Sequence, residues 1–282
     1  MTEMSIYSKQ LAEMNELKDN SEGAVLSYMK RKMVSFEKGD VSGFSPVNVF
    51  ASLGYNRVLE EMADRGFDFY SMTIEGAKQE KTVLDDYLEK AKWYDPDCLD
   101  VIITRGGYTN DDLAGSFINL CQQHQSAFKD NQDAISCWNL DVILDSFLKN
   151  GMNASTVVSG HIPFHELCML YDMAKKSKKD IVSSCYQKMI ASCLQKCLDS
   201  GVDLNAIDED NRTAFSYSDM EMKSRFVRHQ KMIEDKRLLD LFLIVEQLAK
   251  GPVEPALIQK MTGHIAQLKK DIMNNQKRAR FN

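Results

Sequence analysis

The fold is decided by residues 40–68, DVSGFSPVNVFASLGYNRVLEEMADRGFD, which predict a turn, a short helix, a second turn and a second helix. Pro46 suits the first position of a helix, because its missing N–H would have no helical partner there. Gly54 ends the first helix, and Gly66 supplies a left-handed cap after the second. The second helix has an apolar stripe at helical spacing, formed by Val58, Leu59, Met62 and Ala63.

A helix pair of this size cannot bury its apolar face alone, so it needs neighbours stacked on both sides. The spacing D-x-x-G-x-[ST]-P from Asp40 to Pro46, followed by Ala51, Gly54, a hydrophobic run and G-x-D, resembles an ankyrin repeat. The resemblance implies an all-α fold: an ankyrin-repeat solenoid of about five irregular helix-turn-helix units with helical caps at both ends.

Further units resemble the same repeat. Residues 160–167, GHIPFHEL, are similar to the T-P-L-H-x-A signature, and residues 201–206, GVDLNA, to the G-A-D-x-N-A turn between repeats. Asn211 then replaces the turn glycine, because asparagine also tolerates positive φ. Weaker similarity extends over 82–106 and 142–151, so that five units are expected in all.

The predicted organisation has three parts. A helical cap is expected over 1–38 and divergent ankyrin repeats over 39–218, at about 39–69, 70–107, 108–154, 155–206 and 207–218 onward; 219–282 is expected to be a C-terminal helical cap or extension. The fourth repeat carries an insertion at 173–181, which is either a solvated loop or part of a binding face. Two questions stay open: whether 1–38 is instead a mobile tail, and whether the helix after Pro255 is an independent partner-binding element.

Composition indicates a folded protein of the reducing cytoplasm. Apolar residues make up 44% of the chain and charged residues 27%, and no run of about 18 apolar residues exists, so no membrane span is expected. The N-terminus lacks an apolar signal segment, and seven cysteines without framework spacing favour free thiols. Residues 219–282 carry a balance of +5, which leaves −11 on the preceding residues. An acidic body argues against a nucleic-acid partner.

Candidate catalytic chemistry is weak. His161, His165 and Cys168 have a spacing that invites a zinc site, but Pro163 interrupts the helical face between the histidines, so no metal or cofactor is expected. Cys193 and Cys197 lie one turn apart and are expected to be buried apolar side chains. The alternative function is a cysteine-dependent enzyme whose C-terminal segment is positioned by the repeats, with a histidine-lined cavity around residues 185–265 as its mark.

The expected function is non-catalytic binding of a partner protein. In the ankyrin family the contact residues are in the turns and on the exposed side of the first helix. The resemblance carries this role to Val41, Ser42, Phe44, Asn48, Ser52, His161, Glu166, Glu209, Asp210 and Arg212. Phe44 is the strongest candidate, since aromatic residues are enriched at binding hot spots. The eroded repeats also resemble effectors that intracellular bacteria export, which implies a host protein as partner and the host cytosol as a second location.

Overall fold

The computed structural model describes most of the chain. The described residues are 13, 16, 21–32, 46–72, 81–90, 94–129, 139–176, 180–248, 256, 259–261, 263, 264, 266 and 267. The chain divides into two compact units, Met1–Asp219 and Met220–Asn282.

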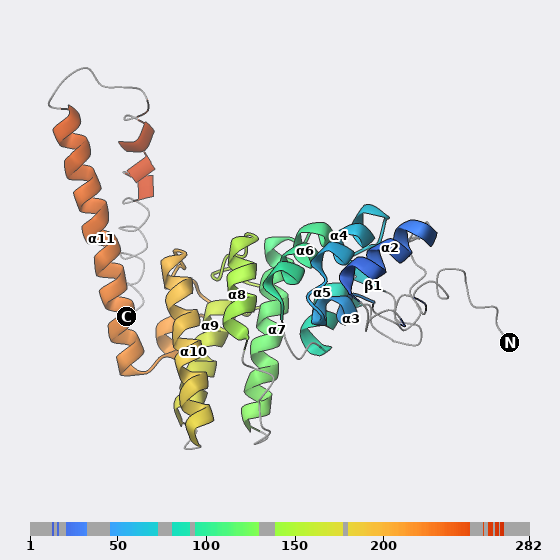
Figure 1. Cartoon of the computed structure of the whole chain (residues 1–282). Coiled ribbons are helices and arrows are strands. Elements are labelled where there is room, and N and C mark those ends of the chain that lie inside the picture. The colour runs from blue at the N-terminus through green and yellow to red at the C-terminus, as the bar shows by residue number, and fades with distance from the viewer. Residues whose placement is uncertain are drawn as a thin grey trace. The chain divides into compact units, whose positions relative to one another are not determined.

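In the described part of the first unit, the helices follow one another along the chain as successive pairs (Figure 1). The pairs are α3 (Pro46–Ser52) with α4 (Asn56–Asp64), α5 (Val83–Lys90) with α6 (Pro96–Gly106), α7 (Asn110–Lys129) with α8 (Leu140–Lys149), and α9 (Pro163–Lys176) with α10 (Asp180–Asp199). Helix α2 (Glu22–Lys32) precedes them, and the short 3-10 helix η2 (Ala214–Tyr217) follows them.

The pairs stack into two rows of helices. The first helices contact one another in the order α3, α5, α7, α9 and η2, and we call this the first-helix row. The second helices contact one another in the order α4, α6, α8 and α10, with α2 packed against α4. The predicted all-α repeat solenoid is therefore confirmed. The sequence did not predict the small hairpin of β1 (Ser71–Met72) and β2 (Lys81–Thr82) before α5.

The core lies between the two rows. Apolar residues at helical spacing face inward from each pair, as in α8, where Ile143, Leu144 and Phe147 are buried. The fully buried large side chains of this unit include Phe50, Leu59, Met62, Tyr87, Phe117, Phe147 and Phe164.

The second helices of three pairs end in the same way. Gly66, Gly151 and Gly201 follow α4, α8 and α10 with φ angles of 90°, 95° and 85°. The next residue in each case donates its N–H to a carbonyl five residues back: Phe67 to Met62 (3.0 Å), Met152 to Phe147 (2.9 Å) and Val202 to Cys197 (3.1 Å). The glycine in the left-handed conformation ends the helix, and the chain then turns towards the first helix of the following pair.

The described part of the second unit is dominated by α11 (Met220–Leu248). Met222, Phe226 and Ile244 of this helix are buried. The predicted helix after Pro255 falls mostly outside the described residues, and its role as cap or binding element stays a prediction. Among the described helices, none has a long enough apolar stretch to cross a membrane.

Candidate functional site

The turn before α9 projects as a tight finger. Val158 and His161 exchange both backbone hydrogen bonds at 2.9 Å across a two-residue loop. Both loop residues are left-handed, Ser159 with φ 49° and Gly160 with φ 82°. This combination matches the right-handed twist of a hairpin, so the finger holds its shape without a larger sheet.

The turn before η2 forms a second finger with a loop one residue longer. The Asp208 N–H donates to the Arg212 carbonyl at 3.1 Å, and the Asp208 carboxylate accepts from the backbone N–H of Asp210 and of Arg212 at 3.0 and 2.9 Å. Asn211, with φ 57°, occupies the left-handed position that the sequence predicted for it. The Asp208 carboxylate thus stabilises the loop conformation of this finger through hydrogen bonds to its backbone.

The two fingers are joined to each other. The Glu209 N–H donates to the Gly160 carbonyl at 3.1 Å, and the Asp203 N–H donates to the Ser155 hydroxyl at 2.6 Å. The contact is close: a Cβ added at Gly160 would lie 2.3 Å from Glu209 Oε2. The spacing between the fingers is therefore set by backbone contacts.

Each finger exposes one apolar side chain at the same position. Val157 follows Gly151 by six residues, and Ile207 follows Gly201 by six residues. Both side chains are 52% exposed. Sequence reasoning missed these two residues, although their equal distance from the two helix-ending glycines was a usable signal.

The sequence prediction that Glu166 is an exposed contact residue is wrong. Glu166 was expected on the exposed side of the first helix, but it is 2% exposed. Its carboxylate accepts hydrogen bonds from Gln122 at 3.3 Å and Gln125 at 2.7 Å, and it lies 2.8 Å from His161 Nδ1. Both glutamines belong to α7, so Glu166 joins two neighbouring repeats instead of facing a partner.

His165 is buried beside the second finger. Its Nδ1 lies 3.5 Å from Asp208 Oδ2, and its ring centroid lies 5.2 Å from that of Tyr217. Burial lowers the pKa of His165 below its ordinary value more than the Asp208 carboxylate raises it. Burial, together with the hydrogen bond that Tyr217 donates to Asp208, raises the pKa of Tyr217 to about 12. These groups fasten α9 to the fifth unit.

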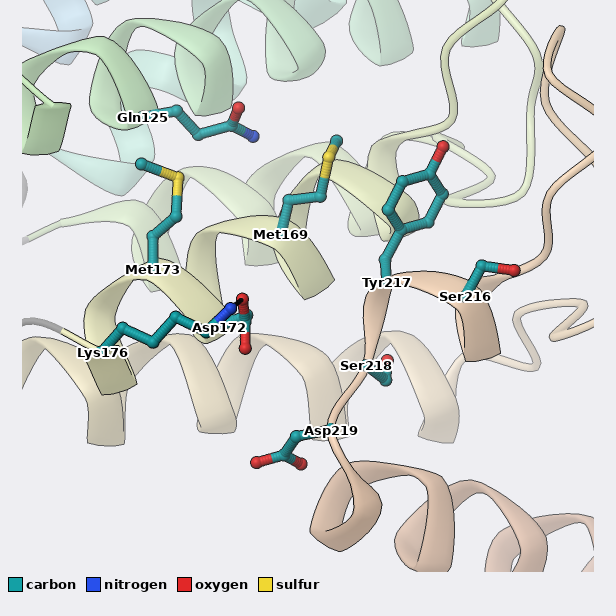
Figure 2. Close-up of a pocket in the computed structure, with 9 residues that line it drawn as sticks. All are labelled: Gln125, Met169, Asp172, Met173, Lys176, Ser216, Tyr217, Ser218 and Asp219. Carbon is teal, nitrogen blue, oxygen red and sulfur yellow. Dashed lines mark hydrogen bonds and ion pairs between the residues drawn. The ribbon is translucent and has the colours of Figure 1, made fainter.

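A pocket of about 450 Å³ opens beside this network, between α7, α9, η2 and the two residues that follow η2. Figure 2 shows Met169 and Met173 projecting from α9, with Gln125 of α7 on one side and Tyr217 on the other. Methionine adapts its shape to irregular apolar partners. Polar groups complete the lining: Asp172, Lys176, Ser216, Ser218 and Asp219.

The charges at the pocket are paired. Lys176 lies 2.5 Å from Asp172, and Lys175 lies 2.5 Å from Asp219. Both lysines lie in residues 173–181, the predicted insertion, at the end of α9, which has 14 residues and is followed by α10 with 20 residues. Met173 and Lys176 of this segment therefore line one side of the pocket.

The remaining predicted contact residues have different environments. Val41, Ser42 and Phe44 lie outside the described residues. Asn48 is half-buried, and its Nδ2 donates to the buried Asp86 at 2.6 Å, whereas Ser52 is exposed. On the fingers, His161 is half-buried, and three predicted residues are exposed: Glu209, Asp210 and Arg212.

The cysteines of the described repeats are mostly buried thiols. Burial raises the pKa of Cys168 and of Cys193 to about 12, and it raises the pKa of Cys197 well above its ordinary value. A thiol acts as a nucleophile through its thiolate, which these environments disfavour. Cys185 is exposed. The described geometry thus gives no support to a cysteine-dependent enzyme at these positions.

Comparisons with known proteins find little sequence similarity. No family model matches the chain, and no curated protein matches it. Seven chains of solved structures match, one of them described as "Crystal Structure of EF0377 an Ankyrin Repeat Protein". It is 13% identical, with coverage of 79% of this chain and 96% of that chain and a TM-score of 0.46. The description of this chain as a helical repeat therefore rests on its own turns and helix contacts.

Proposed function

We propose that this chain is a non-catalytic scaffold that binds a partner protein through its two fingers and the first-helix row. The observation that carries the proposal is the pair of exposed apolar side chains, Val157 and Ile207, at equivalent positions of neighbouring fingers. Because the Glu209 to Gly160 hydrogen bond joins the fingers, the two side chains are presented at a fixed spacing. Preorganised contacts of this kind lower the entropy cost of binding.

The pocket supports the same function. Its apolar wall of Met169, Met173 and Tyr217 suits an apolar or aromatic side chain of the partner. The polar lining residues, which include Asp172, Lys176 and Asp219, suit the polar backbone around such a side chain. A partner that contacts the second finger and reaches the first-helix row would pass this pocket, since Tyr217 fastens the finger to α9 and lines the pocket as well.

The experiment compares three single variants of the full chain as bait. Val157→Asp and Ile207→Asp each place a charge on one finger, and Val227→Asp places one on α11, where Val227 is 56% exposed. Proteins captured from a cell lysate by the unmodified chain are quantified for each variant. We expect partners to be lost with both finger variants and retained with Val227→Asp, with Kd raised about tenfold or more for each finger change.

Thermal unfolding of the same variants is the control. Because all three side chains are half or more exposed, the melting temperatures should stay close to that of the unmodified chain. Capture that is unchanged in both finger variants would refute the proposal. The pocket is tested separately with Met173→Lys, which should weaken the same partners while leaving proteins bound elsewhere unaffected.

The identity of the partner as a host protein, and a role as an exported bacterial effector, stay predictions from the resemblance. Their test uses the same baits in two lysates, one from a bacterial cell and one from a eukaryotic cell. A partner that depends on Val157 and Ile207 and is captured from bacterial lysate alone would contradict the effector prediction.

A further inference from the structure

Helix α11 carries apolar residues on more than one side. Met222, Phe226 and Ile244 are buried, whereas Met232, Leu239 and Leu243 are 57%, 60% and 50% exposed. Spacings of seven and four residues place these last three on one face of the helix, and we call them the α11 stripe. Contiguous exposed apolar residues on a helix commonly mark an interaction surface.

The charges around the α11 stripe are unevenly distributed along the helix. The same face continues towards the N-terminus through Arg228 and Arg225, both exposed. Asp235 and Lys236 border the stripe near its middle, and both are exposed. Two copies of α11 paired in parallel and in register would place each arginine against its own counterpart, which is repulsive.

An antiparallel pair removes this repulsion. If the two-fold axis passes between Asp235 and Lys236, each of these residues faces the other in the second copy. The same register places Met232 opposite Leu239. It also places Leu243 opposite Arg228, whose aliphatic stem can cover an apolar side chain. In this register, opposite charges face each other, and each apolar residue faces an apolar side chain or an aliphatic stem of the second copy. The α11 stripe is therefore complementary to a second copy of itself across a two-fold axis.

We propose that the α11 stripe is the contact surface of an antiparallel homodimer of this chain. Self-complementarity about a point is what a two-fold symmetric contact requires, because each residue pair then occurs twice. A different protein or a membrane surface would not require Asp235 and Lys236 to match each other. This contact uses residues of the second unit and is independent of the proposed binding through the fingers.

The first experiment measures the oligomeric state of the full chain by sedimentation equilibrium. Leu239→Glu places a charge in the stripe of both copies, and we expect it to raise the dimer Kd about 100-fold or more. The matched control is Leu238→Glu, which changes a residue that is 51% exposed but turned about 100° around the helix. This control should leave the dimer Kd nearly unchanged.

The possible outcomes distinguish whether the α11 stripe contacts a second copy, its own chain or a membrane surface. An unmodified chain that stays monomeric overturns the proposal, as does equal weakening by Leu238→Glu and Leu239→Glu. If Leu239→Glu lowers the melting temperature of the monomer by many degrees, the stripe is covered by its own chain and the proposal is wrong. Binding of the monomer to anionic lipid vesicles that is lost in Leu239→Glu would assign the stripe to a membrane surface instead.

The second experiment tests the orientation. Met232→Cys and Leu239→Cys are made separately and mixed under mild oxidation, with the unmodified chain as the background for native thiols. We expect a cross-linked dimer from the mixture and far less from either variant alone, since residues 232 and 239 face each other only in the antiparallel register. Efficient cross-linking of each variant with itself would indicate a parallel dimer and refute the proposed geometry.

Discussion

Acid should weaken the contact between α7 and α10 through one buried histidine. His124 is 8% exposed, and its Nδ1 lies 2.8 Å from the Tyr186 hydroxyl. Burial lowers the pKa of His124 to about 4, against about 6.5 in an unfolded chain. Between these values the unfolded chain binds more protons than the folded one, so stability rises with pH in this range and is lost as pH falls.

The size of the effect follows from the two pKa values. At pH 5 the His124 contribution should lower the free energy of unfolding by about 2 kcal/mol relative to pH 8, approaching about 3 kcal/mol below pH 4. His165, whose pKa is also lowered by burial, adds a loss in the same direction. Both side chains should therefore contribute to the acid sensitivity between pH 6.5 and 5.

Urea unfolding followed by circular dichroism measures this effect at a series of pH values. The variant His124→Gln keeps a polar group near Tyr186 but removes the titration. Its stability at pH 8 is expected to be lower than that of the unmodified chain, but its loss between pH 8 and pH 5 should be smaller by about 2 kcal/mol. If both proteins lose the same free energy over this range, the reasoning about His124 is refuted.

Two further predictions concern a polar contact between repeats and the backbone conformation of two turn glycines. Asn48→Asp would place a second carboxylate beside the buried Asp86 and should cost about 3 kcal/mol at pH 7. Gly201→Ala should cost about 1–2 kcal/mol through its φ of 85° alone, since nothing lies within 4 Å of the added Cβ. Gly160→Ala should cost more, because its Cβ would also displace Glu209. Urea midpoints test both, and equal midpoints for the two glycine variants would contradict the second.

Local signals in the sequence were sufficient to predict where several helices begin and end, whereas the stacked arrangement was predicted from the resemblance to ankyrin repeats. Helices α3, α6 and α9 begin at Pro46, Pro96 and Pro163, where proline suits the first helical position. The helix-ending glycines have positive φ, as does Asn211. These features depend on the preferences of single residues, so a single sequence suffices to find them.

The contacts between repeats could not be predicted from the sequence. The Tyr108 hydroxyl donates to the Phe69 carbonyl at 2.7 Å and accepts from the Leu84 N–H at 3.0 Å, thereby fastening the β1–β2 hairpin region to α5. The partners of Glu166 lie more than 40 residues upstream, on α7. Its burial was missed because helical periodicity describes one helix and says nothing of which neighbour covers it.

Buried and half-buried carboxylates explain how the irregular units keep a fixed position relative to one another. Along the first-helix row, a carboxylate of one unit accepts a hydrogen bond from a neutral donor of the adjacent unit: Asp86 from Asn48, Asp85 from Ser116, and Glu166 from Gln125. Apolar surfaces alone tolerate sliding, whereas a buried carboxylate without its donor is strongly destabilising. These hydrogen bonds therefore hold the successive units from α3 to α9 at one position against the next.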